Sequence, residues 1–93
     1  MDKSEAKAIL SRELAGYRQL PYQELIARLE IEDLREVRGA SGTTYQLEFQ
    51  LLWDDEKSGH LRVMAMIDDG GLRAFVPLTD DFIIAPDGSF IDE

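Results

Sequence analysis

The spacing of apolar residues changes once along the chain, and this change constrains the fold more than any other feature. Between residues 6 and 29, apolar residues recur three and four positions apart, which gives a helix one apolar stripe. Between residues 45 and 53 they recur at every second position, which is the spacing of a strand with one buried face. The sequence therefore predicts helices first and a sheet after them.

Two helices are expected before residue 30. Asp2 and Glu5 have the spacing of a capping box at the start of the first helix. Pro21 disfavours helical backbone at Leu20 and can itself open a second helix, so the two helices should meet at a bend near Leu20. The residues expected to form the two apolar stripes are Ala6, Ile9, Leu10, Leu14 and Tyr17, then Tyr22, Leu25, Ile26 and Leu29.

The sheet is expected to begin with a short edge strand over Asp33–Arg38, followed by a turn at residues 39–42. A strand over residues 44–53 comes next, and a polar loop over residues 54–59 leads into another alternation from Leu61. A last short hairpin around residues 86–88 should join residues 82–84 to residues 90–91.

The pair Asp69-Gly70 predicts a two-residue hairpin turn, because it separates two alternating runs. Such a turn fixes the register of the strands around it. The cross-strand pairs that we expect are Ile67 with Leu72, Ala65 with Ala74, Val63 with Val76, Leu61 with Leu78, Leu51 with Leu61, and Phe49 with Val63.

Together these elements predict one α+β domain over residues 1–93. Two N-terminal helices (1–30) pack on one face of a roughly four-stranded antiparallel β-meander (33–93) that ends in a short hairpin. At 93 residues the chain has room for one core.

The charge is strongly negative and unevenly distributed. The net charge is −9, and residues 39–93 carry eleven acids against three bases. Such a field repels phosphate and anionic lipid, so no nucleic-acid or membrane partner is expected. The chain has no cysteine, which excludes disulfides and thiolate chemistry. No signal-peptide pattern or long apolar run is present, so we expect a cytoplasmic protein.

The sheet face opposite the helices is the first candidate site. Its expected residues mix methionine, phenylalanine and arginine, a combination typical of protein interfaces. The C-terminal hairpin, a second copy of the chain or another protein could each cover it. The candidate interaction face consists of Glu48, Arg62, Met64, Met66, Arg73 and Phe75.

Acidic loops are the second candidate. Hard cations take oxygen ligands from such loops, but no segment has the spacing of a calcium-binding loop. Aspartate is also a favoured turn residue. The candidate acidic loop residues are Asp54, Asp55, Glu56, Asp68, Asp69, Asp80 and Asp81.

No combination of residues predicts catalysis. His60 is the single histidine, no serine lies in a nucleophile elbow, and no glycine-rich phosphate-binding loop is present. We therefore expect a non-enzyme without a cofactor or a specific metal site.

Several segments resemble a family of short, uncharacterised bacterial proteins. The likeness spans most of the chain and implies a free-standing bacterial domain, but it carries no activity or site residue. The segments are Leu20-Pro21-Tyr22-Gln23-Glu24-Leu25, Ser41-Gly42-Thr43-Thr44-Tyr45, Leu61-Arg62-Val63-Met64, Ile67-Asp68-Asp69-Gly70-Gly71, Phe75-Val76-Pro77-Leu78-Thr79-Asp80-Asp81-Phe82-Ile83 and Pro86-Asp87-Gly88-Ser89-Phe90.

The leading functional hypothesis is a small protein-interaction module whose partner is an unidentified protein or a second copy of the chain. One alternative is an acidic inhibitor or immunity-type protein that binds a basic partner through its acidic loops. The other is a small-ligand binder or minor enzyme with a pocket between helices and sheet. Such a pocket would use Tyr17, Tyr22, Glu48 or His60 and would need roughly 300 Å³.

Overall fold

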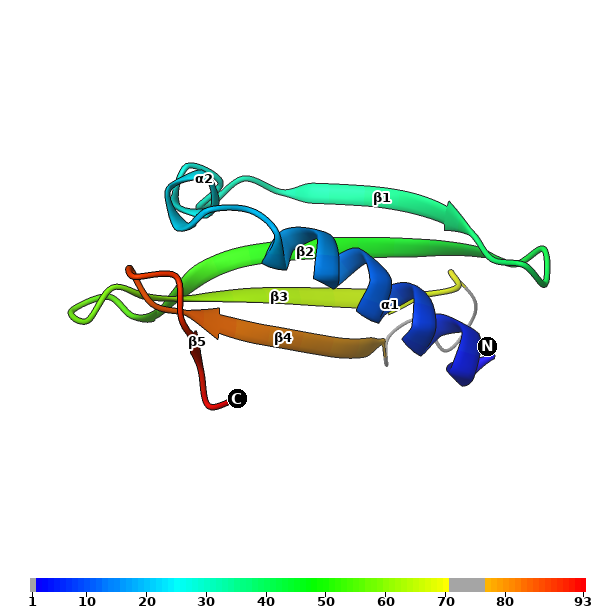
Figure 1. Cartoon of the computed structure of the whole chain (residues 1–93). Coiled ribbons are helices and arrows are strands. Elements are labelled where there is room, and N and C mark those ends of the chain that lie inside the picture. Colours follow the sequence, from blue (N-terminus) through cyan, green and yellow to red (C-terminus); the bar gives the residue numbers. More distant parts are fainter. Residues whose placement is uncertain (1, 71–76) are drawn as a thin grey trace.

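Helices form one layer of the protein and an antiparallel sheet forms the other. The computed structural model describes residues 2–70 and 77–93. Along the chain the elements are α1 (Lys3–Arg18), α2 (Tyr22–Ile26), β1 (Asp33–Arg38), β2 (Thr44–Asp55), β3 (His60–Asp68), β4 (Leu78–Ile84) and β5 (Phe90–Ile91). Figure 1 shows α1 crossing the sheet diagonally, which confirms the predicted α+β fold.

Helix α1 begins where the sequence predicts. The Asp2 carboxylate accepts a hydrogen bond from the Glu5 amide at 3.0 Å. The Glu5 side chain instead accepts hydrogen bonds from Ser41 and from the Tyr45 hydroxyl, so it ties the helix to the sheet. The predicted stripe is buried along its whole length: Ala6, Ile9, Leu10, Leu14 and Tyr17.

Helix α2 is shorter than the predicted helical region. It follows the bend after α1, with Pro21 as its N-cap residue, and residues 27–30 form turns. Leu25 is fully buried, while Tyr22, Ile26 and Leu29 pack partly buried against the core. The predicted apolar stripe therefore faces inward although the regular helix ends early.

The sheet has five strands in the order β1-β2-β3-β4-β5, each antiparallel to its neighbour. The predicted edge strand is β1, which pairs with β2 from Asp33 opposite Phe49 to Arg38 opposite Thr44. The predicted turn joins them: Gly42 has a φ of +91°, which glycine adopts without steric cost. Its amide donates to the Gly39 carbonyl and the Gly39 amide donates to Thr43, a pairing typical of a hairpin that ends in a β-bulge.

The register between β2 and β3 differs from the prediction by two residues. Leu51 lies opposite Val63 and Phe49 lies opposite Ala65, with Trp53 opposite Leu61. A shift of two residues leaves every side chain on its expected face, because side chains alternate with a period of two. Strand β2 also runs to Asp55, and its register against β3 shifts between Trp53 and Asp55.

The predicted two-residue turn at Asp69-Gly70 is wrong. Leu78 lies opposite Ile67 and not opposite Leu61, whose partner is Ile84. The expected partners Leu72, Ala74 and Val76 lie outside the described residues. In the observed register Phe82 and Ile84 both become buried, so burial of these large side chains outweighs the local turn signal.

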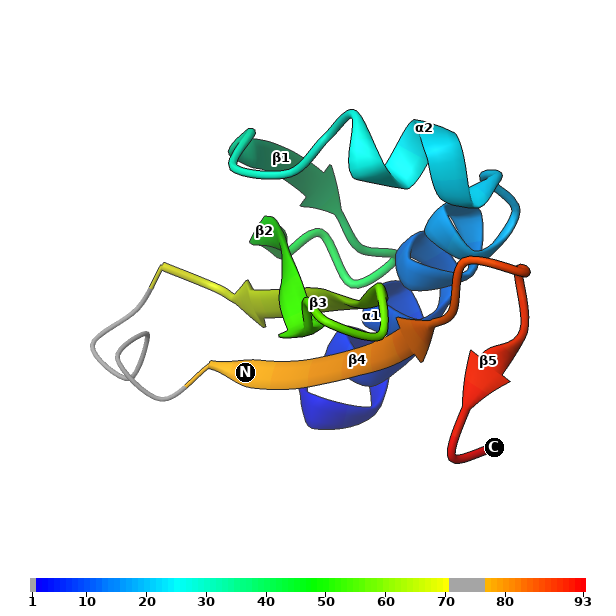
Figure 2. The same ribbon diagram turned by 90° about the vertical axis from the view of Figure 1, so that its left-hand side faces the viewer.

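The predicted C-terminal hairpin is confirmed, with Ile84 opposite Phe90 and Ile83 opposite Ile91. Phe90 meets the Phe82 ring edge to face at 5.5 Å. The Arg18 guanidinium lies 4.7 Å from the Phe82 ring and 4.8 Å from the Phe90 ring, and it pairs with Glu93 at 2.8 Å. Figure 2 shows β5 on the same side of the sheet as the helices.

Candidate functional site

The face of the sheet that points away from the helices is called the outer face here. None of the described helices or strands lies over it (Figures 1 and 2). Met64 and Met66 sit half-buried at its centre on β3, opposite Gln50 and Glu48. Of the candidate interaction residues, Glu48, Arg62, Met64 and Met66 share this face. The other two, Arg73 and Phe75, lie outside the described residues.

Arg62 links two carboxylates across the outer face. Its Nη2 lies 2.6 Å from Asp54 Oδ1 on β2, and its Nη1 pairs with Asp81 on β4. The hydrogen bonds to Asp54 and then to Asp81 raise the pKa of Arg62. Arg62 is therefore a neutralised centre of a three-strand ion-pair network and not a free cation.

Most of the predicted acidic loop residues are not in loops, which corrects the sequence interpretation. Asp54 and Asp55 end β2, Asp68 ends β3, and Asp80 and Asp81 lie inside β4. Strand β2 is longer than predicted, and β3 pairs with residues 78–84 rather than with the earlier residues that were expected. The acidic residues therefore lie within paired strands. Only two of the set remain outside strands: Glu56 and Asp69.

Three exposed apolar side chains lie near the corner of the sheet where α2 leads into β1, and one of them, Ile31, lines a pocket with each of the other two. Ile31 is 57% exposed, Leu34 on β1 is 65% exposed and Leu52 on β2 is 39% exposed. We call these three residues the apolar corner. The sequence interpretation did not single them out. The sequence did contain a signal for them. Leu34 and Leu52 stand at positions of their strands where the alternation expects polar side chains, on the face away from the core.

A shallow groove runs beside the apolar corner toward α1. One part, of about 310 Å³, is lined by residues 30–32 and 50–52. The next part, of about 340 Å³, reaches Tyr17 and Arg28. The groove therefore meets the size expected of a small-ligand pocket, although it is open on the surface and not enclosed between helices and sheet.

The four residues proposed for such a pocket are not all brought together. Tyr17 lines the groove, but the Tyr22 hydroxyl donates to the Gly59 carbonyl at 2.6 Å. Glu48 lies on the outer face, away from the helices, where it accepts from Gln50. His60 begins β3 opposite Asp55 and directly follows Gly59, the residue that Tyr22 contacts. Glu48 therefore does not belong to a pocket between helices and sheet, because side chains alternate along β2 and its own points to the other face.

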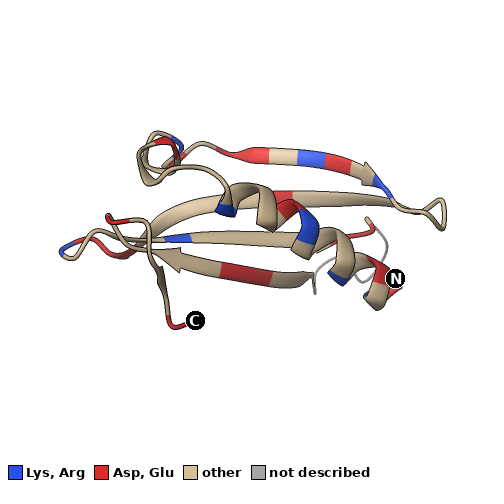
Figure 3. Cartoon of the chain, viewed as in Figure 1, with Lys and Arg blue, Asp and Glu red and all other residues tan. Residues whose placement is uncertain are grey.

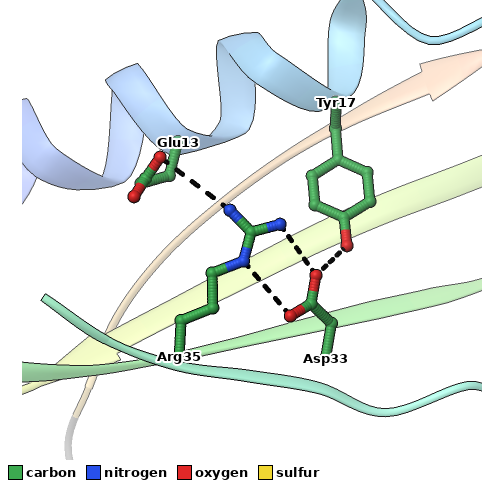
Figure 4. A network of polar contacts seen from close by, with 4 residues as sticks. All are labelled: Glu13, Tyr17, Asp33 and Arg35. Carbon is green, nitrogen blue, oxygen red and sulfur yellow. Dashed lines mark hydrogen bonds and ion pairs between the residues drawn. The ribbon is translucent and has the colours of Figure 1, made fainter.

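A polar network borders the groove and ties α1 to β1 (Figure 4). The Tyr17 hydroxyl donates to Asp33, and the Arg35 guanidinium donates to both oxygens of Asp33 at 2.8 and 3.2 Å. Arg35 also lies 3.9 Å from Glu13. Each of these side chains contacts another member of the network, which positions β1 against the helix.

The network shifts the pKa values of its members. Its arginine lowers the pKa of Asp33 by hydrogen bonding, and Asp33 in turn raises the pKa of Arg35. Burial and then the Asp33 hydrogen bond raise the pKa of Tyr17. Tyr17 also stacks on Phe49 with ring centroids 4.6 Å apart. These shifts hold the arginine and aspartate charged and the tyrosine neutral, which is the state of a structural tie.

Within residues 2–70 and 77–93, no three histidine or acidic side chains come together as a metal site. The same described part of the chain has no helix of the length and apolar character needed to cross a membrane.

Comparison with protein-family models, curated proteins and solved structures gives no match. The fold and the surface therefore carry the functional argument alone.

Proposed function

We propose that this protein is a small, non-enzymatic interaction module whose outer face binds a basic partner protein. The observation that supports this is the apolar corner. It holds all three exposed large apolar side chains of the described residues, and Ile31 lines one pocket with Leu52 and another with Leu34. No described helix or strand covers the sheet face that carries Leu34 and Leu52. Clustered exposed apolar residues on a small protein are typical of interaction sites.

The charge of the outer face favours a basic partner. Carboxylates outnumber guanidinium groups on it, and Arg62 is already neutralised. Acids outnumber the single base, Arg62, among the charged residues of β2, β3 and β4, and Figure 3 shows the acidic band on β4. A partner surface with apolar residues ringed by lysine or arginine would match both the corner and its border. The acidic residues of the outer face are Glu36, Glu48, Asp54, Asp68 and Asp81.

Capture from the native lysate tests this proposal with matched variants. Leu34→Lys/Leu52→Lys adds two positive charges to exposed positions of the outer face. Ala8→Lys/Ala15→Lys adds the same charge to exposed positions on α1. The same protein should be captured by the wild type and by the α1 variant, and lost with the outer-face variant. Capture by all three proteins alike would refute the choice of surface.

The salt dependence of the association rate distinguishes binding to a basic partner from a purely apolar contact. Screening shortens the reach of charge from about 10 Å at 0.1 M salt to about 3 Å at 1 M. The association rate of the captured partner should therefore fall steeply with salt. An unchanged rate would leave the apolar corner as a docking site but contradict the basic character of the partner.

A small-ligand role is the second candidate, and the groove of about 340 Å³ at Tyr17 and Arg28 favours it. A metabolite library screened by the thermal unfolding midpoint tests this role. A ligand that raises the midpoint of the wild type, but not that of Arg28→Ala, would support it.

A further inference from the structure

Strand β1 leaves one of its edges open. It pairs with β2 along one side, and none of the other described strands pairs with it. In an antiparallel ladder, residues whose backbone groups face the partner alternate with residues whose groups face away. The Gly39 amide donates to the Thr43 carbonyl directly opposite, which sets this alternation. It follows that the backbone groups of Leu34, Glu36 and Arg38 point to the open edge.

Two of these three residues carry opposite charges. Glu36 and Arg38 are exposed on the outer face, opposite the uncharged Gln46 and Thr44 of β2. Neither has an ion-pair partner among residues 2–70 and 77–93. Figure 3 shows the mixture of both charges along β1.

We propose that β1 pairs antiparallel with β1 of a second copy, about a two-fold axis through Val37. Glu36 of each copy then lies opposite Arg38 of the other, and the two Val37 residues face each other. Hydrogen bonds form between the backbone groups of Glu36 and Arg38 across the axis. The interface joins the two sheets and leaves both outer faces on one side.

Charge complementarity selects this register. A two-fold axis perpendicular to a sheet pairs only residues on the same face, so the axis must pass through one residue. An axis at Glu36 would set Glu36 against itself, and an axis at Arg35 would set two arginines together. An axis at Leu34 would oppose Glu32 and Glu36. Since like charges directly opposite are destabilising, of these four axes only the one at Val37 pairs Glu36 with Arg38 and sets no like charges directly opposite.

The other edge of the sheet is unsuited to the same pairing. There β5 covers the end of β4, and the free part of β4 carries Asp80 and Asp81. Self-pairing at that edge would bring carboxylates together. The proposed dimer is independent of the basic partner, and the two proposals can fail separately.

Sedimentation equilibrium of charge-swapped variants tests the dimer. The salt should be about 0.15 M, where the Debye length of about 8 Å screens the repulsion between two chains of net charge −9. The wild type should dimerise with a Kd between about 1 µM and about 1 mM. Glu36→Arg and Arg38→Glu should each weaken the dimer at least about tenfold, because each places two like-charged pairs at the interface. An equimolar mixture of the two variants should form a heterodimer at least as tight as the wild-type dimer.

Three results would overturn the proposal. These are a wild type that stays monomeric to about 1 mM, variants that dimerise as well as the wild type, or a mixture no tighter than either variant alone. Pairing of Glu36→Arg with wild type as tight as its pairing with Arg38→Glu would also overturn it, since an axis at Glu36 sets position 36 of one copy against an unchanged Glu36 in both mixtures. Circular dichroism of each variant checks that it is folded.

Amide hydrogen exchange gives a second readout on unmodified protein. The amides of Glu36 and Arg38 should exchange more slowly as the protein concentration rises. The Val37 amide already faces β2 and should change little. Equal behaviour of all three amides would contradict the proposed backbone pairing.

Discussion

The Tyr45 hydroxyl donates a hydrogen bond of 2.7 Å to the Glu5 carboxylate, which joins the first turn of α1 to β2. Ser41 donates to the same carboxylate from its hydroxyl and its amide. These bonds lower the pKa of Glu5, with the Ser41 hydroxyl as the largest cause. The same contact raises the pKa of Tyr45 from its ordinary 10.0 to about 12, chiefly through the hydrogen bond to Glu5. One charged residue thus fixes the helix, the hairpin turn and the strand to one another.

The Tyr45 contact makes stability sensitive to alkaline pH. Because the folded-state pKa is raised, the contribution is complete below pH 10 and is lost as the pH rises toward 12. Absorbance at the tyrosinate band should show that Tyr45→Phe loses a late-titrating tyrosine, while Tyr17, whose pKa is also raised, titrates late in both proteins. Far-UV circular dichroism at each pH excludes unfolding as the cause. Identical titration curves for the two proteins would contradict the contact.

The contribution of Glu5 to stability depends on pH in the opposite direction: it is lost as the pH falls. Its lowered pKa means that the contribution is present above the ordinary value of 4.5 and is lost as the pH falls through the folded-state pKa. The unfolding midpoint of Glu5→Gln should therefore differ from the wild-type midpoint most at pH 7, and the difference should shrink toward pH 3. A difference that stays constant with pH would show that the Glu5 charge contributes nothing.

Opposite faces of β2 should respond differently to truncation. Phe49 is fully buried and stacks on Tyr17, so Phe49→Ala should destabilise the protein by about 3–5 kcal/mol. Leu52→Ala, on the exposed face of the same strand, should change stability by no more than about 0.5 kcal/mol. Urea unfolding of both variants measures the difference. Equal losses would contradict the assignment of faces.

Two glycines should respond with opposite sign to replacement by alanine. Gly16 lies in α1 with nothing within 4 Å of an added Cβ, so Gly16→Ala should stabilise the protein by about 0.5–1 kcal/mol. A Cβ at Gly39 would lie 2.4 Å from Glu5 Oε1, so Gly39→Ala should displace the carboxylate and destabilise the protein. Thermal unfolding of both variants checks the two signs.

The sequence predicted the parts of the fold that depend on short-range patterns. The α1 stripe, the turn at residues 39–42 and the C-terminal hairpin each follow from residues a few positions apart. The β3–β4 register was wrong because it depends on which distant residues become buried, and in the observed register these include Phe82 and Ile84. Local turn chemistry does not contain that information.

The candidate surface was predictable only in part. Alternation placed Met64, Met66 and Arg62 on the outer face correctly. It did not show that Arg62 would be neutralised, because Asp54 and Asp81 reach it from two different strands. Nor did it show that Leu34 and Leu52 would lie at one corner, since that depends on the pairing of β1 with β2.

Site-specific photo-crosslinking tests the proposed interaction surface most directly. A photoreactive amino acid is placed at Leu52 on the outer face in one variant and at Ala15 on α1 in another. Both are irradiated in the native lysate at about 0.15 M salt. A single basic protein should be cross-linked from Leu52 and not from Ala15. Cross-linking of the same protein from both positions, or from Ala15 alone, would contradict binding through the outer face.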